Sequence, residues 1–216
     1  VENVSVCYGK LAVLFDITVN VRQGEVVFLV GRNGAGKTTL FRTIAGFLEP
    51  AGGDIYFKGN SIKKIGAYKV ARLGAKYIHQ DKQVFNDLSV RENLELSSYA
   101  TKDYDWDPVL AMFPKLKILI DRKAGNLSGG EKQMLLMAMA LIGKPDLVMM
   151  DEPTEWLAPH VIKDLAVIFR ELASRTTLFI VEQNLPLIAS IADRIYCIKE
   201  GRIVNDVRDK DDIKNM

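Results

Sequence analysis

Residues 31–39 read Gly31, Arg32, Asn33, Gly34, Ala35, Gly36, Lys37, Thr38 and Thr39, and they follow directly on an apolar run at 26–30. A short continuous apolar run is typical of a strand that is buried on both faces. Glycines let a loop turn its backbone N–H groups inward, and a following helix directs its positive end at the same point. The stretch therefore predicts a strand, a phosphate-binding loop and a helix over 37–45 that Gly46 ends.

Two side chains of this loop suit the chemistry of a bound nucleotide. Lys37 supplies a point charge for the β- and γ-phosphates, and the hydroxyl of Thr38 is a ligand for Mg²⁺. The plainer alternative is a glycine-rich turn that merely joins a strand to a helix. Because the GxxxxGKT pattern stands between an apolar strand and a helix, the phosphate site is favoured over that alternative.

Asp151 and Glu152 come directly after the apolar residues 147–150. Adjacent side chains at a strand end point in different directions, which allows them two different roles. We expect Asp151 to face Mg²⁺ and Glu152 to act as a general base on a water aligned with the γ-phosphate. An acidic turn after a strand is the plain alternative, and the phosphate loop upstream disfavours it.

A second glycine-bearing turn lies downstream and reads Leu127, Ser128, Gly129, Gly130 and Glu131. Ser128 and Glu131 have the spacing of a capping box at the head of a largely apolar helix that runs to about residue 142. The free N–H groups at such a helix start form an anion site for which the sequence offers no local anion. In the alternative, Ser128 only caps its own helix; both functions are compatible because a cap uses part of the donors.

The rest of the chain alternates between strand and helix patterns. Alternation at Ile17, Val19 and Val21 predicts a half-buried antiparallel strand, and residues 50–80 predict short strands with glycine turns at 52–53 and 59. Residues 147–150, 159–174 and 177–181 predict strand, helix and strand. Strands separated by helices favour a parallel sheet with both faces covered, so the expected fold class is α/β.

Residues 85–127 interrupt this order with helical patterns. Ser89 with Glu92 predicts a capping box, and Asp107 before Pro108 predicts an N-cap followed by proline at the first helical position. The stretch is therefore interpreted as an inserted helical lobe. The charged residues 206–216 are interpreted as a tail.

Composition excludes several classes of protein. A hydrophobic content of 48% and 26% charged residues are ordinary for a globular domain, and a net charge of +2 gives no footprint for nucleic acid. The longest apolar run, residues 134–142, is far shorter than the roughly 20 residues of a membrane-spanning helix. The two cysteines, Cys7 and Cys197, lie far apart without metal-ligand spacing, which favours a reducing cytosolic compartment.

The phosphate loop, the LSGGE turn and the acidic pair together resemble the ATP-binding cassette family, and the resemblance covers essentially the whole chain. Further motifs are similar to the second ATPase subunit of branched-chain amino acid importers: Tyr8-Gly9, Val84-Phe85, Phe113-Pro114-Lys115-Leu116, Leu157-Ala158-Pro159 and Ile191-Ala192-Asp193-Arg194. The ATPases of urea and lipopolysaccharide transporters are close relatives of that subfamily. The family motifs are thus more specific than the subfamily motifs.

The resemblance implies a fold and an activity. It implies one ATPase domain over 1–216: a P-loop NTPase core with an antiparallel β subdomain over 1–84 and 128–216, and a helical subdomain over 85–127. The implied reaction is hydrolysis of ATP to ADP and phosphate with Mg²⁺, coupled to transport.

The same resemblance implies site residues and partners. Ser128, Gly129, Gly130 and Glu131 would face the γ-phosphate held by the 31–39 loop of a second ATPase subunit, either the same chain or a related one. Gln80 would contact Mg²⁺ and the transmembrane permease, and Tyr8 would stack on adenine with Val13 beside it. A substrate-binding protein outside the membrane would be an indirect partner, and the chain would lie on the cytoplasmic face of the membrane.

Two residues depart from the family pattern. Gln183 stands where most members have a histidine near the γ-phosphate. An amide donates a hydrogen bond but does not titrate near neutral pH. Gln183 is therefore interpreted as a sensor of the γ-phosphate and not as an acid. Trp156 stands where a small residue, usually glycine, is expected at a subunit contact.

Two other classes of protein also contain a phosphate loop of this kind. A cassette protein that acts on nucleic acid or ribosomes is disfavoured, because residues 39–126 alone separate the two motifs and the chain holds a single cassette. A small-molecule kinase shares the phosphate loop but has no use for the LSGGE turn.

Overall fold

The computed structural model describes residues 1–81 and 83–214, and its centre is a six-stranded sheet. The strands stand in the order β11 (Arg202–Val207), β10 (Arg194–Lys199), β3 (Val26–Val30), β9 (Thr177–Val181), β8 (Leu147–Asp151) and β7 (Ala75–Ile78). Pairing is parallel from β10 to β7, and only β11 runs antiparallel. This mainly parallel sheet confirms the expected α/β class.

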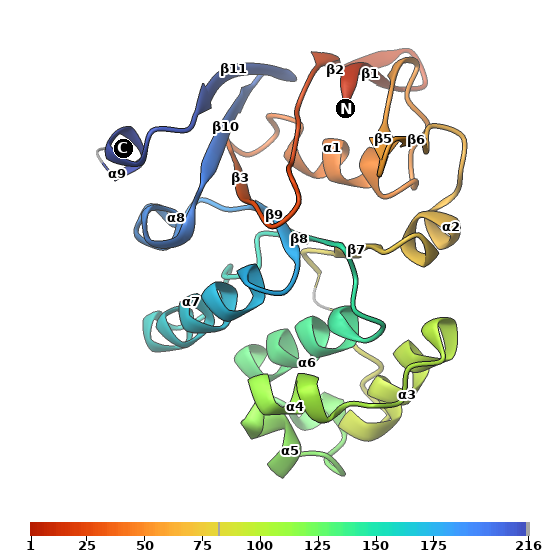
Figure 1. The fold of residues 1–216 in the computed structure, drawn as a ribbon, viewed down its shortest axis with the longest axis vertical. Coiled ribbons are helices and arrows are strands. Elements are labelled where there is room, and N and C mark those ends of the chain that lie inside the picture. Colours follow the sequence, from red (N-terminus) through yellow and green to blue (C-terminus); the bar gives the residue numbers. More distant parts are fainter. Residues whose placement is uncertain (82, 215–216) are drawn as a thin grey trace.

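Side chains alternate across the central sheet and divide the apolar core into two layers. In β3, Val27 and Leu29 face α1 (Lys37–Ile44), whereas Val26 and Phe28 belong to the core of the opposite face. That opposite core is covered by α7 (Pro159–Ala173), α8 (Leu185–Ile191) and the helices of the lower lobe (Figure 1). Helices therefore cover both faces of the parallel strands, as such a sheet requires.

A second, antiparallel sheet lies over α1 (Figure 1). Its strands are β2 (Leu11–Ile17), β1 (Glu2–Tyr8) and β4 (Gly52–Asp54), and β5 (Tyr56–Phe57) with β6 (Asn60–Ser61) forms a small hairpin. The strand expected over 17–21 is wrong: β2 ends at Ile17, and Val19 and Val21 follow outside any strand. Alternation alone did not show that this strand starts six residues earlier.

The lower lobe in Figure 1 is helical. It comprises α3 (Val90–Thr101), α4 (Asp107–Met112), α5 (Pro114–Ile118), the short 3₁₀ helix η1 (Ala124–Asn126) and α6 (Gly129–Leu141). The capping boxes at Ser89 and Ser128 are both confirmed. The N-cap expected at Asp107 is wrong by one residue, because Trp106 caps α4 and Pro108 occupies the second helical position.

Two other expectations need correction. A helix, α2 (Ala67–Arg72), lies within the stretch expected to hold only strands, and the glycines at 52–53 belong to β4. The interpretation of residues 206–216 as a tail is also wrong, because this stretch carries the end of β11 and the short helix α9 (Lys210–Lys214), and Ile213 packs into the core. Residues 215–216 lie outside the described residues. Among the described residues, no helix combines the length and apolarity needed to cross a membrane.

Candidate nucleotide site

The 31–39 loop joins β3 to α1 and leaves no room for a side chain at two of its glycines, Gly31 and Gly36. Gly36 is the N-cap of α1 with a φ of 106°, and a Cβ there would lie 2.6 Å from Leu14 Cδ2. At Gly31, a Cβ would lie 2.4 Å from the carbonyl oxygen of Ile198. Only glycine fits both positions, and α1 therefore presents unblocked N–H groups at its start.

Lys37 folds back over this loop and is 5% exposed. Its Nζ donates to the carbonyl oxygens of Gly31 at 2.9 Å and Arg32 at 3.2 Å, and it lies 3.4 Å from Glu152 Oε1. The ammonium is thus held between the loop and the turn after β8. A positive charge in that position suits an anionic ligand bound against the loop.

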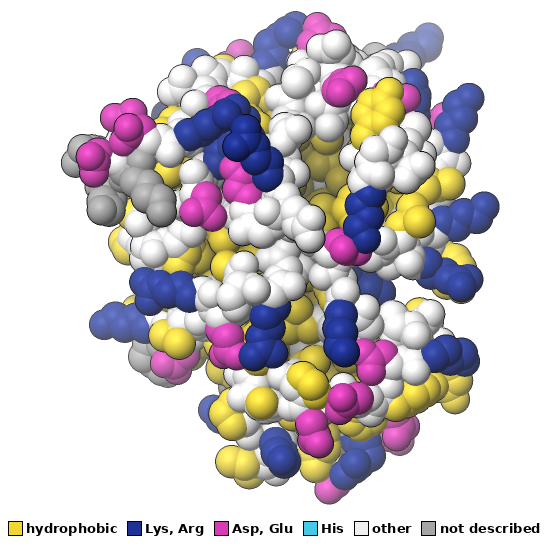
Figure 2. All heavy atoms as spheres, viewed as in Figure 1, with side chains coloured by type: hydrophobic (Ala, Val, Ile, Leu, Met, Phe, Trp, Pro, Cys, Tyr) yellow, Lys and Arg dark blue, Asp and Glu magenta, His cyan; other side chains and the backbone are white. Residues whose placement is uncertain are grey.

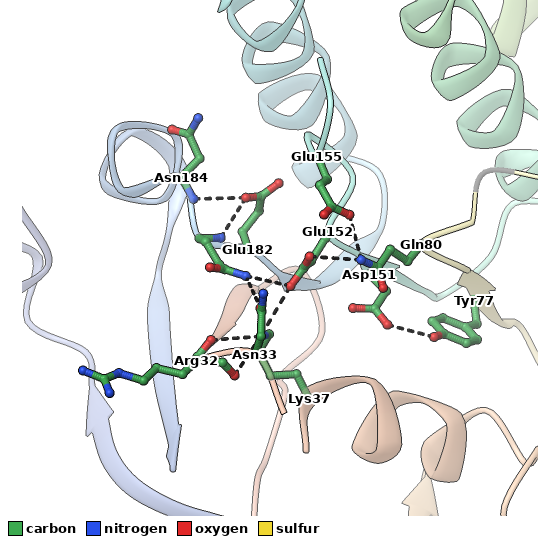
Figure 3. Close-up of polar contacts among 12 residues, drawn as sticks. Arg32, Asn33, Lys37, Tyr77, Gln80, Asp151, Glu152, Glu155, Glu182 and Asn184 are labelled. Atoms are coloured by element: carbon green, nitrogen blue, oxygen red, sulfur yellow. Dashed lines mark hydrogen bonds and ion pairs between the residues drawn. The ribbon is translucent and has the colours of Figure 1, made fainter. Parts of the chain in front are cut away.

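Glu152 receives three polar side chains from distant parts of the chain (Figure 3). Besides Lys37, Gln183 Nε2 donates to Glu152 Oε1 at 2.9 Å and Gln80 Nε2 donates to Glu152 Oε2 at 3.3 Å. Glu152 also has a φ of 49°, a backbone conformation that is uncommon outside glycine. A carboxylate that stands on a strained backbone and is surrounded by polar partners is typical of functional sites.

The two glutamines extend this network in different directions. Gln183 Nε2 also donates to Asn33 Oδ1 at 2.9 Å, which ties the turn after β9 to the phosphate loop. Gln80 Nε2 donates to Glu155 Oε2 at 2.7 Å. The structure therefore brings together Asn33, Lys37, Gln80, Glu152 and Gln183, all of which the sequence had singled out.

Asp151, the last residue of β8, is 2% exposed. Its Oδ2 accepts a hydrogen bond from the Tyr77 hydroxyl at 3.1 Å, whereas Oδ1 is buried and has no hydrogen-bond partner among the described residues. Burial raises the pKa of Asp151, and the nearby hydroxyls of Thr38 and Tyr77 oppose that rise. Burial and the Asp151 charge raise the pKa of the Tyr77 phenol, which therefore remains a donor.

An orphaned carboxylate oxygen near a threonine hydroxyl fits Mg²⁺. Thr38, Gln80 and Asp151 line one open cavity of about 790 Å³. No cluster of three or more His, Cys, Asp or Glu side chains suited to a metal occurs in the described part of the chain. This sparse donor set agrees with the habit of Mg²⁺, which binds through one or two protein groups together with phosphate oxygens and water.

Of the two residues expected to contact adenine, the structure brings only Val13 to the phosphate loop. Val13 lines a neighbouring cavity of about 240 Å³ together with Gly34, Lys37, Thr39 and Glu152. Tyr8 lies at the end of β1, is 43% exposed and is not among the residues that line this cavity. The structure thus brings Val13 to the loop and leaves Tyr8 exposed at the end of β1.

The LSGGE turn sits at the head of α6. Glu131 Oε2 accepts a hydrogen bond from the Ser128 backbone N–H at 2.8 Å, which lowers the pKa of Glu131, and Ser128 Oγ accepts from the Glu131 N–H at 3.4 Å. Gly129 is exposed, whereas Gly130 packs against Val161 of α7. None of these residues lines the two cavities at the phosphate loop.

Glu182 was missed by the sequence analysis. It is 3% exposed; its Oε1 accepts from the Thr154 N–H at 3.0 Å and from the Thr154 hydroxyl, and its Oε2 accepts from the N–H groups of Gln183 at 2.8 Å and Asn184 at 3.1 Å. This carboxylate joins the turn after β8 to the turn after β9. An acidic residue directly after an apolar strand was the available signal.

Trp156 lies four residues beyond Glu152 and is 90% exposed. Its φ of 62° belongs to the left-handed region, in which glycine is favoured. The backbone therefore explains why a small residue was expected at this position.

The fold and the site define a P-loop NTPase. A phosphate loop lies between the parallel strand β3 and the helix α1, and the acidic pair Asp151 and Glu152 lies at the end of β8, two strands away from β3 in the sheet. Residues 14–155 match the family described as ABC transporter. The chain belongs to that family and is an ATPase of it.

Known proteins are similar to this chain over nearly its whole length. A high-affinity branched-chain amino acid transport ATP-binding protein, BraG of Pseudomonas aeruginosa, is 39% identical, and the match covers 94% of this chain and 89% of BraG. The probable branched-chain amino acid transport ATP-binding protein LivF of Archaeoglobus fulgidus is 36% identical over 91% of this chain and 86% of LivF. A solved ATP-binding cassette of an ABC transporter superposes with a TM-score of 0.90 at 28% identity, covering 99% of this chain and 92% of that one.

Proposed function

We propose that this chain hydrolyses ATP to drive an importer of branched-chain amino acids across the cytoplasmic membrane. The observation that carries the proposal is the position of Glu152, which Lys37 and Gln183 hold beside the phosphate loop. The amino acid class follows from the relatives BraG and LivF, whose names specify branched-chain amino acid transport. The cytoplasmic face is the expected location.

The proposed reaction is attack of water on the γ-phosphorus of ATP. A bond forms from the water oxygen to phosphorus, the bond to the bridging oxygen breaks, and ADP leaves with that electron pair. Glu152 takes the proton of the attacking water. Lys37 stabilises the charge on the phosphate oxygens. Gln183 orients Glu152 with one N–H and would turn its other N–H, which bonds Asn33 in this structure, to the γ-phosphate.

Mg²⁺, held by Thr38, Asp151 and Gln80, would neutralise phosphate charge when it is bound with the nucleotide. The buried, partnerless Asp151 Oδ1 supports this assignment.

A second ATPase subunit completes each site in this proposal. Ser128, Gly129, Gly130 and Glu131 line neither cavity at their own chain's phosphate loop, and Gly129 is exposed at the start of α6. The N–H groups at a helix start favour an anion, here the γ-phosphate bound by the partner. The partner is a second copy of this chain or a related ATPase.

A groove of about 760 Å³ supports the proposed contact with permease subunits. Its walls come from α2 and β7 on one side and from α3 and α6 on the other, and they include Phe47, Tyr68 and Leu96, all partly exposed apolar side chains. Tyr77, His79 and Asp81 line both this groove and the cavity at Thr38 and Asp151. A permease segment in the groove would therefore touch the same strand end that leads to Gln80.

Purification of the tagged chain in mild detergent, followed by uptake of labelled leucine into vesicles that hold the purified complex, tests the proposal. We expect permease subunits to co-purify and uptake to require ATP and a substrate-binding protein. Glu152→Gln is expected to retain ATP binding, lose turnover and trap a dimer, while Glu171→Gln, which alters an exposed pair with Arg175, keeps the native rate.

The outcomes separate the parts of the proposal. Native turnover in the Glu152→Gln chain would overturn the assignment of the base. An active complex that carries urea or a lipid in place of leucine would overturn only the cargo. Binding to nucleic acid or ribosomes would overturn the transport function. Figure 2 argues against such binding, because Lys and Arg side chains are interspersed with Asp and Glu on the face shown, and the described residues form no basic patch there.

A further inference from the structure

Tyr77 and Asp151 meet because of the strand pairing. β7 and β8 run parallel with Tyr77 opposite Met149, and Asp151 lies two residues beyond Met149 on the same face. A tyrosine side chain is long enough to reach that next position along the neighbouring strand. Its hydroxyl donates to Asp151 Oδ2 at 3.1 Å (Figure 3).

The ring of Tyr77 is held by aromatic neighbours. It packs edge-on against Phe41 with ring centres 6.0 Å apart and against Phe47 at 6.2 Å, and it lies 4.1 Å from the ring of His79. Phe41 is on α1, one turn beyond Thr38. The hydroxyl of Tyr77 is therefore positioned by a ring that packs against the same helix that carries Thr38.

This contact makes the two oxygens of Asp151 unequal. Oδ2 is occupied by the Tyr77 hydroxyl, and Oδ1 is buried with no partner among the described residues. A carboxylate held by one oxygen can turn only with the loss of that hydrogen bond. Outer hydrogen bonds of this kind orient metal ligands and affect metal affinity.

We propose that Tyr77 is a positioning residue that orients Asp151 so that Oδ1 is presented to the divalent cation bound with the nucleotide. The inference rests on the proposed Mg²⁺·ATP site. A purely structural tyrosine would contribute through its ring, which packs against Phe41 whether or not the hydroxyl is present. The hydroxyl alone carries the proposed function, and Tyr77→Phe isolates it.

The test measures binding of Mn²⁺, with a non-hydrolysable ATP analogue, by electron paramagnetic resonance. We expect Tyr77→Phe to bind Mn²⁺ roughly tenfold more weakly than the native chain. Affinity for the analogue in EDTA should stay native, because the phosphate loop is unchanged. Tyr196→Phe is the matched control: it also removes a hydroxyl on a parallel strand, one that hydrogen-bonds the Asn20 backbone and belongs to neither the phosphate loop nor the acidic pair.

Each outcome has a separate meaning. Native Mn²⁺ affinity in a folded Tyr77→Phe chain would overturn the inference, and so would an equal loss of affinity for the analogue without metal. In an Asp151→Asn chain, Tyr77→Phe should cause no further loss; an unchanged tenfold loss there would also overturn it. Failure of the native chain to bind Mn²⁺ with the analogue would instead overturn the proposed Mg²⁺·ATP site.

Discussion

Gln183 donates a hydrogen bond to Glu152 across 2.9 Å, from the turn after β9 to the turn after β8. The same amide reaches Asn33 in the phosphate loop at 2.9 Å. Because an amide carries no charge and does not titrate near neutral pH, this link between three loops is unaffected by pH in that range. The carboxylate proposed as the general base is therefore oriented by a neutral donor in addition to Lys37.

Gln183→His is expected to introduce a pH dependence that the native chain lacks at this position. A protonated imidazole beside Glu152 would pair with the carboxylate and weaken it as a base. An imidazole has an ordinary pKa near 6.5 and the carboxylate raises it, so turnover at pH 5.5 should fall to about a tenth or less of its value at pH 8. Rates of ATP hydrolysis from pH 5.5 to 8.5 measure this, and an identical step in the native chain would contradict it.

Trp156→Gly is expected to stabilise the isolated chain. Trp156 has a φ of 62°, which is strained for a residue with a Cβ, and its side chain is 90% exposed, so little burial is lost. The left-handed conformation costs an L-residue roughly 1–2 kcal/mol, and glycine's greater freedom in the unfolded chain offsets part of that gain. We expect the free energy of unfolding to rise by about 0.5–1 kcal/mol in a urea titration.

Trp156→Ala provides the control for that experiment. Alanine keeps the Cβ and hence the strain, so the free energy of unfolding should stay near the native value. Equal stabilisation by alanine and glycine would show that the indole, and not the backbone, was responsible.

Asp206→Asn is expected to destabilise the stretch interpreted as a tail. Arg194 is 4% exposed, and its Nε and Nη2 donate to Asp206 at 2.7 and 2.8 Å. The substitution leaves this buried guanidinium without its counter-charge. Because Asp206 is itself partly exposed and asparagine keeps one acceptor, we expect a loss of about 1–2 kcal/mol.

The effect of Asp206→Asn should depend on pH. Hydrogen bonding to Arg194 holds the pKa of Asp206 well below its usual range. The pair thus contributes fully above the unfolded pKa near 4 and loses its contribution as the pH falls toward the folded pKa. Urea titrations at pH 7 and pH 3 should show a smaller difference between variant and native chain at pH 3.

Asp16→Asn is the matched control, since Asp16 forms an exposed pair with Arg202 at 4.0 Å. Its effect should stay within about 0.5 kcal/mol at both pH values. A loss as large as that of Asp206→Asn would indicate a general effect of charge.

The parts of the site that the sequence predicted are those that short motifs encode. Gly36 and Lys37 belong to the GxxxxGKT pattern between a strand and a helix, and this pattern in this place predicted a phosphate site there. Ser128 and Glu131 likewise satisfy each other within one turn, and the structure confirms that capping box. Local hydrogen bonds and backbone conformations can be predicted from spacing because both partners lie within a few residues.

Contacts between distant residues could not be predicted in this way. Tyr77 reaches Asp151 only because β7 and β8 are neighbours, and no local pattern states the strand order. Glu182 with Thr154 depends on the pairing of β8 with β9. The charged residues 206–216 were interpreted as a tail because Asp206 finds Arg194 only once β11 pairs with β10.

The two glycines of the LSGGE turn are expected to respond differently to alanine. At Gly130, a Cβ would lie 2.8 Å from Val161 Cγ1, whereas at Gly129 the nearest atom would be Leu157 Cδ2 at 3.7 Å. Gly130→Ala therefore forces Val161 or the packing of α6 against α7 to shift, and it should lower the free energy of unfolding by about 1–3 kcal/mol.

Gly129→Ala should leave stability near native but reduce turnover, because the added methyl group stands on the exposed surface proposed to close on the partner's γ-phosphate. Urea titration of both variants, together with ATP hydrolysis at saturating ATP, separates the two effects. A Gly129→Ala chain with native turnover would contradict the composite site. A Gly130→Ala chain with native stability would show instead that Val161 can move aside at no cost.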